Sequence, residues 1–536
     1  MRKKRILGLV LASTFLFGVL AACTPAAPTG QQQPETPPAG QQTVPPPGTD
    51  TTSQPSLEAG FQRGIVVLGA TETHSVTPAH HGQLVGHWVN VMTHNGLFRV
   101  AEYALEPVPD LVESWTAITD SLFEMRLHEG VMFHNGDILT AHDVALSLEY
   151  VRRYPYQRGN QSAVESWEVV DDLTILIDTG VANVTFFNQL AHQGNFIFPG
   201  ALIESGHDFS IDPVGTGPFM FSEWRAGDFV HFEAFENYFD QDRFPRVGYV
   251  TWRFVPEGSS RTIALEAGEA DYVIDVALPD VERLRSNPGI TVMERPGATY
   301  SYLVLNPTRA PFDNIHVRHA VDMAMDRDAM LIVSLDGFGV PLSAAVPTFF
   351  PGASTEGTRA HDPEGAIALL AEHGLDPATL GFEMIATDEV TRRRAEVVQA
   401  NVAEIGIPAT ITMMDAAAMG SQTLDESAWQ SAFRGQTATN LPIFTRSMFH
   451  SASLETGNRG RHNMQELDDL IDQAFVTFDE AARMAILNEI SRIANEHATQ
   501  LGTNMNIAMR AFNADLRVPE LAANGFMYKN MIYWAE

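Results

Sequence analysis

The stretch 363–413 alternates helical and strand patterns, and this order constrains the fold more than any other part of the chain. A helical pattern ends at Gly374 and a second one ends at Gly406, and glycine just past a helix suits a left-handed C-cap. Short apolar strand patterns follow the two helices, at 382–386 and 407–413. Alternating helix and strand predicts an α/β domain.

A different pattern precedes this region. "RGIVVLGA" predicts a buried strand, and "LFEMRLHEGVMFHNGD" predicts two half-buried strands around Glu129-Gly130. "WEVVDDLTILIDT" predicts two more, with a turn at Asp171-Asp172. We expect an antiparallel sheet between Ile65 and Thr179, with a helix over 141–151.

The last part of the chain predicts two amphipathic helices around 467–475 and 486–494, where apolar residues recur at three-and-four spacing. After Asn504 the sequence returns to short apolar runs and closes with "NMIYW" near its end. We find no internal repeat.

The N-terminus has the layout of a secretory signal, with "RKKR" before an apolar run at 6–20. That run is too short for a membrane span. Cys23 is the only cysteine, and it follows the small residues of "LAAC", which resembles a bacterial lipobox. We expect 1–22 to be a lipoprotein signal peptide and Cys23 to become the lipidated first residue. An ordinary signal peptide with an incidental cysteine is the alternative.

Residues 23–56 are expected to form the lipid anchor and a disordered tether, because Pro, Gln, Thr and Gly dominate and large apolar residues are rare. The roughly 480 residues that follow exceed one hydrophobic core, so two or three domains are expected. The formal net charge of −32 opposes nucleic acid and anionic lipid as partners. We predict an exported monomer held at the outer face of the cytoplasmic membrane, in a periplasm or at a cell surface.

"FHNGDILTAHDV", residues 133–144, concentrates polar residues that bind metals or catalyse reactions elsewhere. Asn135-Gly136 is a hairpin-type turn pair, and Thr140 with Asp143 forms a capping-box-like helix start. His142 and Asp143 are adjacent on a helix, so their side chains diverge. We interpret the stretch as structural, with a metal or catalytic cluster as the alternative.

A second polar segment, at 73–96, contains five histidines: His74, His80, His81, His87 and His94. Neutral imidazole is a good transition-metal ligand, but the spacing is irregular. We predict no metal site and no cofactor, and metal binding is kept as the alternative.

Enzyme motifs are missing from the sequence. The sequence contains no Gly-x-Ser-x-Gly nucleophile elbow and no P-loop. A hydrolase function therefore has no positive support, and we predict no catalytic residue. "DPVGTGPF", residues 212–219, describes a tight chain reversal because it holds two glycines and two prolines.

Several motifs in order resemble the family 5 bacterial extracellular solute-binding proteins, the peptide, nickel and oligosaccharide group of ABC importers. They run from about Ile65 to Asp376, with weaker similarity to the end of the chain. The matching stretches are "LVESW", "FEMRLHEGVMFHNGDILTAHDVALSLEYV", "DPVGTGPFMFSEW", "FENYFD", "LVLNPTRAPFDNIHVRHAVDMAMDRDAM" and "LLAEHGLD".

The resemblance implies an α/β fold of the type II periplasmic-binding kind, with a two-lobed cleft and an additional β-rich domain. Lobe I would comprise 57–90, 207–300 and 505–536, the β-rich domain 91–206, and lobe II 301–504. The lobes would close over an oligopeptide or similar solute, and the closed form would dock on ABC permease subunits. No bond in the solute would change, so the protein would not be an enzyme.

The family also suggests where a solute would bind. Peptide-binding relatives carry an aspartate four residues before a proline, which pairs with the α-amino group of the ligand. Ala438 stands at that position before Pro442, so a free peptide N-terminus would need another counter-charge, such as Asp425 or Glu426. The residues expected to contact solute are His80, His81, Tyr300, Tyr302, Arg434, Gln436, Thr437 and Asn440.

Two other classes of function stay open. A metal-chelate or oligosaccharide receptor of the same fold would use the histidines or the polar residues around Ala438. An exported hydrolase would turn over a peptide or glycoside substrate.

Overall fold

The computed structural model describes residues 63–73, 75–77, 84–101, 106–154, 161–437, 440–519 and 529–535. These belong to one compact unit, Pro55–Glu536. Cys23 and the predicted signal peptide and tether lie outside the described residues.

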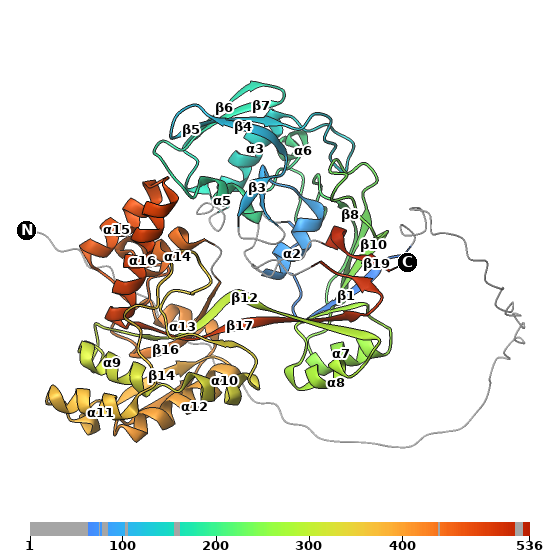
Figure 1. The fold of residues 1–536 in the computed structure, drawn as a ribbon. Helices are drawn as coiled ribbons and strands as arrows, with labels where there is room; N and C mark the ends of the chain where they lie inside the picture. The colour runs from blue at the N-terminus through green and yellow to red at the C-terminus, as the bar shows by residue number, and fades with distance from the viewer. Residues whose placement is uncertain are drawn as a thin grey trace, which may run out of the picture. The chain divides into compact units, whose positions relative to one another are not determined.

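A sheet of 11 strands runs through the unit (Figure 1). Ten of its strands follow one another in the order β15-β14-β16-β12-β17-β11-β1-β10-β9-β8, and β13 pairs with β17 at its side. Their bounds along the chain are β1 Ile65–Gly69, β8 Phe219–Arg225, β9 Phe229–Ala234, β10 Tyr249–Phe254, β11 Tyr272–Ile274, β12 Ile290–Leu305, β13 Val340–Pro341, β14 Phe382–Ala386, β15 Ala409–Met413, β16 Ser431–Thr437 and β17 Gln500–Asn513.

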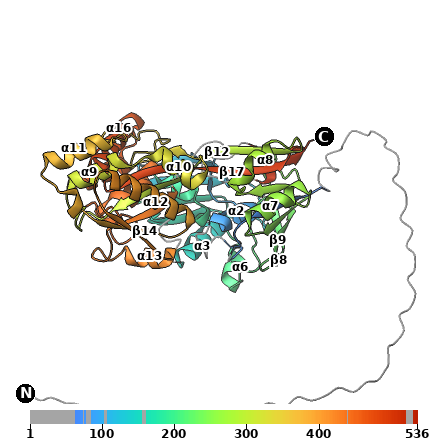
Figure 2. The same ribbon diagram turned by 90° about the horizontal axis from the view of Figure 1, so that it is seen from below.

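Strands β12 and β17 carry the sheet from one half of the unit to the other (Figure 2). They pair antiparallel over most of their length, with register shifts between Pro296 and Tyr300 and between Ser301 and Tyr302. Before the shifts β17 also pairs with β11, and beyond them β12 also pairs with β16. An extra residue in one strand bends and twists the pair locally, so the ribbon is irregular between the two halves.

The α/β alternation predicted for 363–413 is confirmed. Helix α11 spans Pro363–Glu372 and α12 spans Glu389–Glu404, and strands β14 and β15 pair parallel. Gly374 and Gly406 adopt φ of 65° and 85°, as left-handed C-caps require.

Helices cover both faces of the sheet in this second half. One apolar core joins Tyr300 and Tyr302 to α14, α15 and α16, and another joins Leu303 and Leu305 to α9, α11 and α12. Figure 1 shows the two groups on opposite sides of β12 and β17. The bounds are α9 Ile315–Ala324, α10 Arg327–Leu335, α13 Ala416–Gln422, α14 Leu441–Phe449, α15 Gln465–Val476 and α16 Glu480–His497.

The first half of the sheet is covered mainly by three helices and a C-terminal strand pair. Trp88 of α2 packs against Trp252, and α7 and α8 contribute Leu265 and Leu284 to the opposite face. The bounds are α2 Leu84–Thr93, α7 Gly258–Glu266, α8 Val281–Arg285, β18 Leu516–Arg517 and β19 Tyr533–Trp534.

A separate antiparallel sheet of four strands forms the β-rich region, in the order β4-β5-β7-β6. Its core holds Phe123, Met125, Ile175 and Ile177 together with α3. The elements of this region are β2 Phe98–Val100, β3 Pro107–Pro109, β4 Val112–Ala117, β5 Leu122–Leu127, α3 Ala141–Arg152, β6 Ser166–Asp171, β7 Thr174–Asp178, α5 Phe186–Leu190 and α6 Gly200–Ser205.

Two parts of the predicted antiparallel sheet are wrong. Strand β1 lies instead in the large sheet, parallel to β10 and β11, and a local pattern cannot show partners that come about 180 residues later. The run after Gly130 forms only a single bridge, Met132 to Ile138, because the Asn135-Gly136 turn reverses the chain at once.

"FHNGDILTAHDV" is a turn followed by a capped helix, as predicted. Gly136 has φ of 92°, and its N–H donates to the carbonyl of Phe133 at 2.9 Å. Asp143 Oδ2 accepts from the backbone N–H and the hydroxyl of Thr140, both at 2.8 Å. Its Oδ1 accepts from the N–H of Gly200 at 2.7 Å, so this carboxylate also ties α3 to the start of α6.

"DPVGTGPF" is the junction between the β-rich region and the large sheet. A Cβ added at Gly215 would lie 2.2 Å from the carbonyl oxygen of Thr93, and one added at Gly217 would lie 2.4 Å from the carbonyl carbon of the same residue. Only glycine therefore fits at either position. His134 holds the loop through its contact with the carbonyl of Gly217 at 2.9 Å. Burial lowers the pKa of His134 to about 4, so the imidazole is neutral at pH 7.

Thr140→Ala removes the hydroxyl that donates to Asp143. We expect the free energy of unfolding of the β-rich region to fall by about 1 kcal/mol. Asp143→Ala also frees the N–H of Gly200, so its cost should be larger, about 2 kcal/mol. Urea unfolding measures both, and solute affinity should stay unchanged. A Thr140→Ala variant that keeps its stability and loses solute binding would contradict the structural role.

Candidate functional site

Five of the predicted solute-contacting residues meet on β12 and β16, more than 100 positions apart in the chain. In the antiparallel register Tyr300 lies opposite Gln436, and Tyr302 lies opposite Arg434. Thr437 lies opposite Thr299, and their hydroxyl oxygens are 2.8 Å apart. The structure therefore gathers these residues at the crossing between the two halves.

The two tyrosines form a stacked pair inside the second half. Their ring centroids are 5.0 Å apart, and the residues are 0% and 2% exposed. Burial raises the pKa of both phenols, and Arg434 hydrogen bonds with Tyr302. In this conformation both rings belong to the core, so solute contact by Tyr300 and Tyr302 stays a prediction.

Asn440 and Gln436 differ in what their side chains already do. Asn440 caps α14, since its Oδ1 accepts from the N–H of Ile443 at 3.1 Å, and it also lines a cavity. Gln436 donates to the carbonyl of Thr437 at 3.3 Å. His80, His81 and Ala438 lie outside the described residues, so their predicted roles stay predictions.

The cavity beside Asn440 has a volume of about 680 Å³, in the range of small-molecule sites. The β-rich region contributes Glu106, Pro107, Val184 and Asn188, and the crossing contributes Arg295 and Gly297. The second half contributes the remaining wall: Phe349, Phe350, Pro351, Asn440, Leu441, Pro442, Glu480, Arg483, Met484 and Leu487.

This wall combines apolar faces with a few charged groups. Phe349 and Phe350 pack at 4.3 Å between ring centroids, and Glu106 and Glu480 are exposed carboxylates. Arg483 already donates to the carbonyls of Thr477 and Phe478, at 2.9 and 3.1 Å. Such a surface, with two glutamates and two arginines in its lining, suits a solute that has both apolar and charged groups.

One backbone contact lies beside this cavity. The N–H of Val184 in the β-rich region donates to the carbonyl of Phe475 at the end of α15, at 2.9 Å. The β-rich region and the second half therefore touch next to the cavity.

A smaller cavity, of about 390 Å³, shares no lining residue with the larger one. Ser301 of β12 lines it, and Ser301 alternates along the strand with Tyr300 and Tyr302 of the opposite face. Arg394, Thr391 and Asp388 reach it from the start of α12, and Arg434 and Asn506 complete its polar wall.

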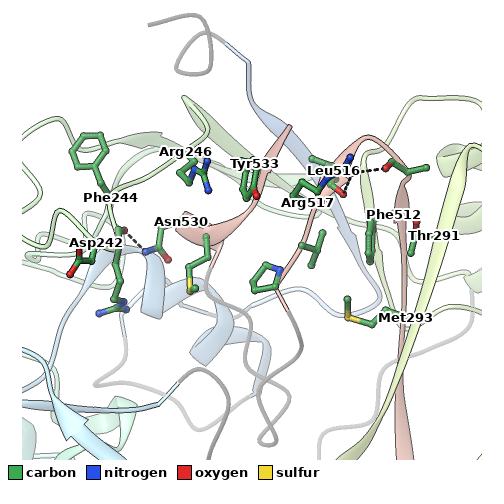
Figure 3. Close-up of a pocket in the computed structure, with 15 residues that line it drawn as sticks. Asp242, Phe244, Arg246, Thr291, Met293, Phe512, Leu516, Arg517, Asn530 and Tyr533 are labelled. Atoms are coloured by element: carbon green, nitrogen blue, oxygen red, sulfur yellow. Dashed lines mark hydrogen bonds between the residues drawn. The ribbon is translucent and has the colours of Figure 1, made fainter. Parts of the chain in front are cut away.

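A third cavity, of about 560 Å³, lies beside the C-terminal strand pair (Figure 3). Its polar groups are already engaged with one another. The guanidinium of Arg246 stacks 3.5 Å from the ring centroid of Tyr533, and Asn530 donates to the carbonyl of Arg243. Arg243 itself pairs with Asp110 at 3.1 Å. This arrangement fixes the C-terminal segment and favours the other two cavities as binding sites.

Most residues that line the cavities were not among the predicted solute-contacting residues. Met484, Leu487 and Arg394 lie on amphipathic helices, where a residue that lines a cavity has the same periodicity as one that packs in a core. Glu106 belongs to no sequence motif that would mark it as a binding residue. Of the predicted residues that the structure describes, Asn440 and Arg434 line a cavity.

No three histidine, cysteine, aspartate or glutamate side chains within the described ranges are placed to hold a metal ion. No helix in the same ranges is long and apolar enough to cross a membrane.

The family model for bacterial extracellular solute-binding proteins, family 5, matches residues 106–453. This chain belongs to that family, which confirms the sequence-based resemblance, and it is a solute-binding protein.

Individual relatives agree with this class. The glutathione-binding protein GsiB of Pectobacterium atrosepticum is 26% identical over 443 residues, which cover 79% of this chain and 85% of that protein. The substrate-binding protein CtaP of Listeria monocytogenes superposes with a TM-score of 0.80 at 20% identity, covering 89% of this chain and 100% of CtaP.

The DppA protein of Helicobacter pylori, solved with the peptide STSA, superposes with a TM-score of 0.76 at 22% identity. That match covers 90% of this chain and 100% of DppA. The predicted α/β fold, of the type II periplasmic-binding kind, is thereby confirmed.

Met484→Trp should fill part of the larger cavity. We expect solute affinity to fall by about tenfold or more, because the indole occupies space that the solute needs. The exposed Ala481→Trp on the same helix is the matched control and should bind normally. Calorimetric titration with a binding solute measures both, and equal affinity of the two variants would show that the solute binds elsewhere.

Proposed function

We propose that this protein captures a short peptide or a similar medium-sized solute in the larger cavity and delivers it to the permease of an ABC importer. The main support is that the β-rich region, the β12–β17 crossing and the second half all contribute residues to the lining of this cavity. A solute there touches all three, so binding favours the closed arrangement.

The names of relatives support a peptide. Glutathione, which names the GsiB relatives, is a tripeptide, and DppA was solved with a four-residue peptide. A volume of about 680 Å³ suits a molecule of this size. The solute is bound and released unchanged, so we propose a non-enzymatic role.

The ammonium of a peptide needs a counter-charge at its binding site. Asp425 accepts from Ser427, and neither Asp425 nor Glu426 lines the larger cavity. Glu106 and Glu480 do line it, and both are exposed carboxylates. We propose that one of them takes the role that Ala438 cannot fill.

The lobes proposed from the resemblance are 57–90 with 207–300 and 505–536, and 301–504, with 91–206 as the β-rich domain. The register shifts of β12, between Pro296 and Tyr302, support a boundary near residue 300. The domain closure that delivers the solute would bend the chain there.

A peptide panel tests the solute class. We expect peptides of two to five residues, glutathione included, to raise the melting temperature of the purified protein in a thermal-shift assay, because each binds only the folded state. Native mass spectrometry of the untreated protein should show a co-purified peptide. Stabilisation by oligosaccharides alone, or stabilisation that a chelator abolishes, would instead support a sugar or metal-chelate receptor.

We further propose that Cys23 is lipidated and holds the protein, as a monomer, at the outer face of the cytoplasmic membrane. The support is the "LAAC" stretch and the Pro- and Gln-rich tether that follows it.

Cys23→Ser tests the anchor. We expect the wild-type protein in the membrane fraction of the expressing cells and the variant in the soluble fraction, since a serine cannot carry the thioether-linked lipid. Fractionation and an acyl-label assay measure this. A membrane-bound and unlabelled Cys23→Ser protein would contradict the proposal.

A further inference from the structure

The smaller cavity is more polar than its place in the fold requires. It is enclosed by the start of α12, by β12, β16 and β17, and by apolar residues of the first half such as Leu278 and Ile507. A cavity at such a junction is ordinarily closed by apolar packing, yet this one is lined by the buried residue Arg394.

Arg394 is the central group of this cavity. It is 5% exposed, and within the described part of the chain its guanidinium makes no hydrogen bond and no ion pair. Burial lowers the pKa of Arg394 to about 10, so the side chain stays cationic at pH 7. The nearby Asp388 carboxylate favours the charged form electrostatically but makes no hydrogen bond with the guanidinium. Among the described residues the N–H groups of Arg394 therefore have no hydrogen-bond acceptor, and an anion would supply one.

Other groups around Arg394 also offer hydrogen-bond donors. Asn506 accepts from Asn504 through Oδ1 at 2.9 Å, so its amide hydrogens remain as donors. The Ser301 hydroxyl makes no hydrogen bond with any described residue, and Ser301 is almost fully buried. Arg434 also lines the cavity, but its guanidinium is already engaged, because it donates to the hydroxyl of Thr423 at 3.1 Å and hydrogen bonds with Tyr302.

One carboxylate lines this cavity, and one of its two oxygens is already hydrogen-bonded. Asp388 caps α12, where its Oδ1 accepts from the N–H and the hydroxyl of Thr391 at 2.7 and 2.9 Å. No ion pair within 4 Å joins it to Arg394 among the described residues. Hydrogen-bond donors therefore outnumber acceptors around the cavity, while Arg394 and Asp388 carry opposite charges.

We propose that the smaller cavity is an oxyanion site, in which Arg394 binds a carboxylate or a comparable oxyanion group, assisted by Ser301 and Asn506. A guanidinium offers paired N–H donors that match the two oxygens of a carboxylate. The proposal does not depend on which solute fills the larger cavity. The anion is either a small free carboxylate or the acidic end of the transported solute, and both present the same chemistry.

Titration of the purified protein with succinate tests the site. We expect calorimetric binding and a higher melting temperature in succinate than in sodium chloride of equal ionic strength, and no binding of the neutral succinamide. Arg394→Gln should weaken succinate binding by about tenfold to a hundredfold, since it removes a charge-assisted hydrogen-bond donor. Arg393→Gln is the matched control, because Arg393 lies on the same helix and is exposed, and it should bind normally.

Two further measurements keep the test decisive. Ser301→Ala and Arg394→Lys should bind more weakly than the wild type, and they replace Arg394→Gln if that variant does not fold. A peptide that displaces succinate would identify the solute's own carboxylate as the occupant, and simultaneous binding would identify a free anion. Equal effects of succinate and chloride on the wild type, or unchanged binding by a folded Arg394→Gln protein, would overturn the proposal.

Discussion

The pairing of β12 with β17 is the constraint on which the rest of this structure depends. These two strands supply the continuous path of the large sheet from one half to the other, and both cavities beside the crossing take residues from them. Their hydrogen bonds hold the halves together, while the register shifts near Pro296 and Ser301 let the ribbon bend. A binding protein that closes on its solute needs two rigid halves and a connection between them that can deform.

The two faces of this ribbon have different chemistry. On one face Tyr300 and Tyr302 stack into an aromatic core that extends to Phe444, with rings 5.5 Å apart, and so supports the wall of the larger cavity from behind. On the other face Ser301 lines the smaller cavity together with Arg394. Strand alternation alone sorts apolar and polar neighbours to opposite sides, so three consecutive residues serve two different environments.

Local patterns predicted the elements of 363–413, the turn at Gly136 and the capped helix after Thr140, because caps, glycines and periodicity act within a few residues. The partners of β1 were beyond such reasoning, since β10 and β11 follow far along the chain. Arg434 and Asn440 were identified through the family resemblance. Arg394 was missed because nothing in its own helix shows that the residues across from it leave a cavity.

The charge of the chain gives Arg394 an unusual setting. With a formal net charge of −32, the surface repels anions at long range, while this guanidinium attracts them only at contact. Added salt screens the long-range repulsion first, because buried groups are screened much less than exposed ones. Anion capture at this cavity would therefore proceed faster at seawater ionic strength than in dilute buffer, the reverse of ordinary electrostatic steering.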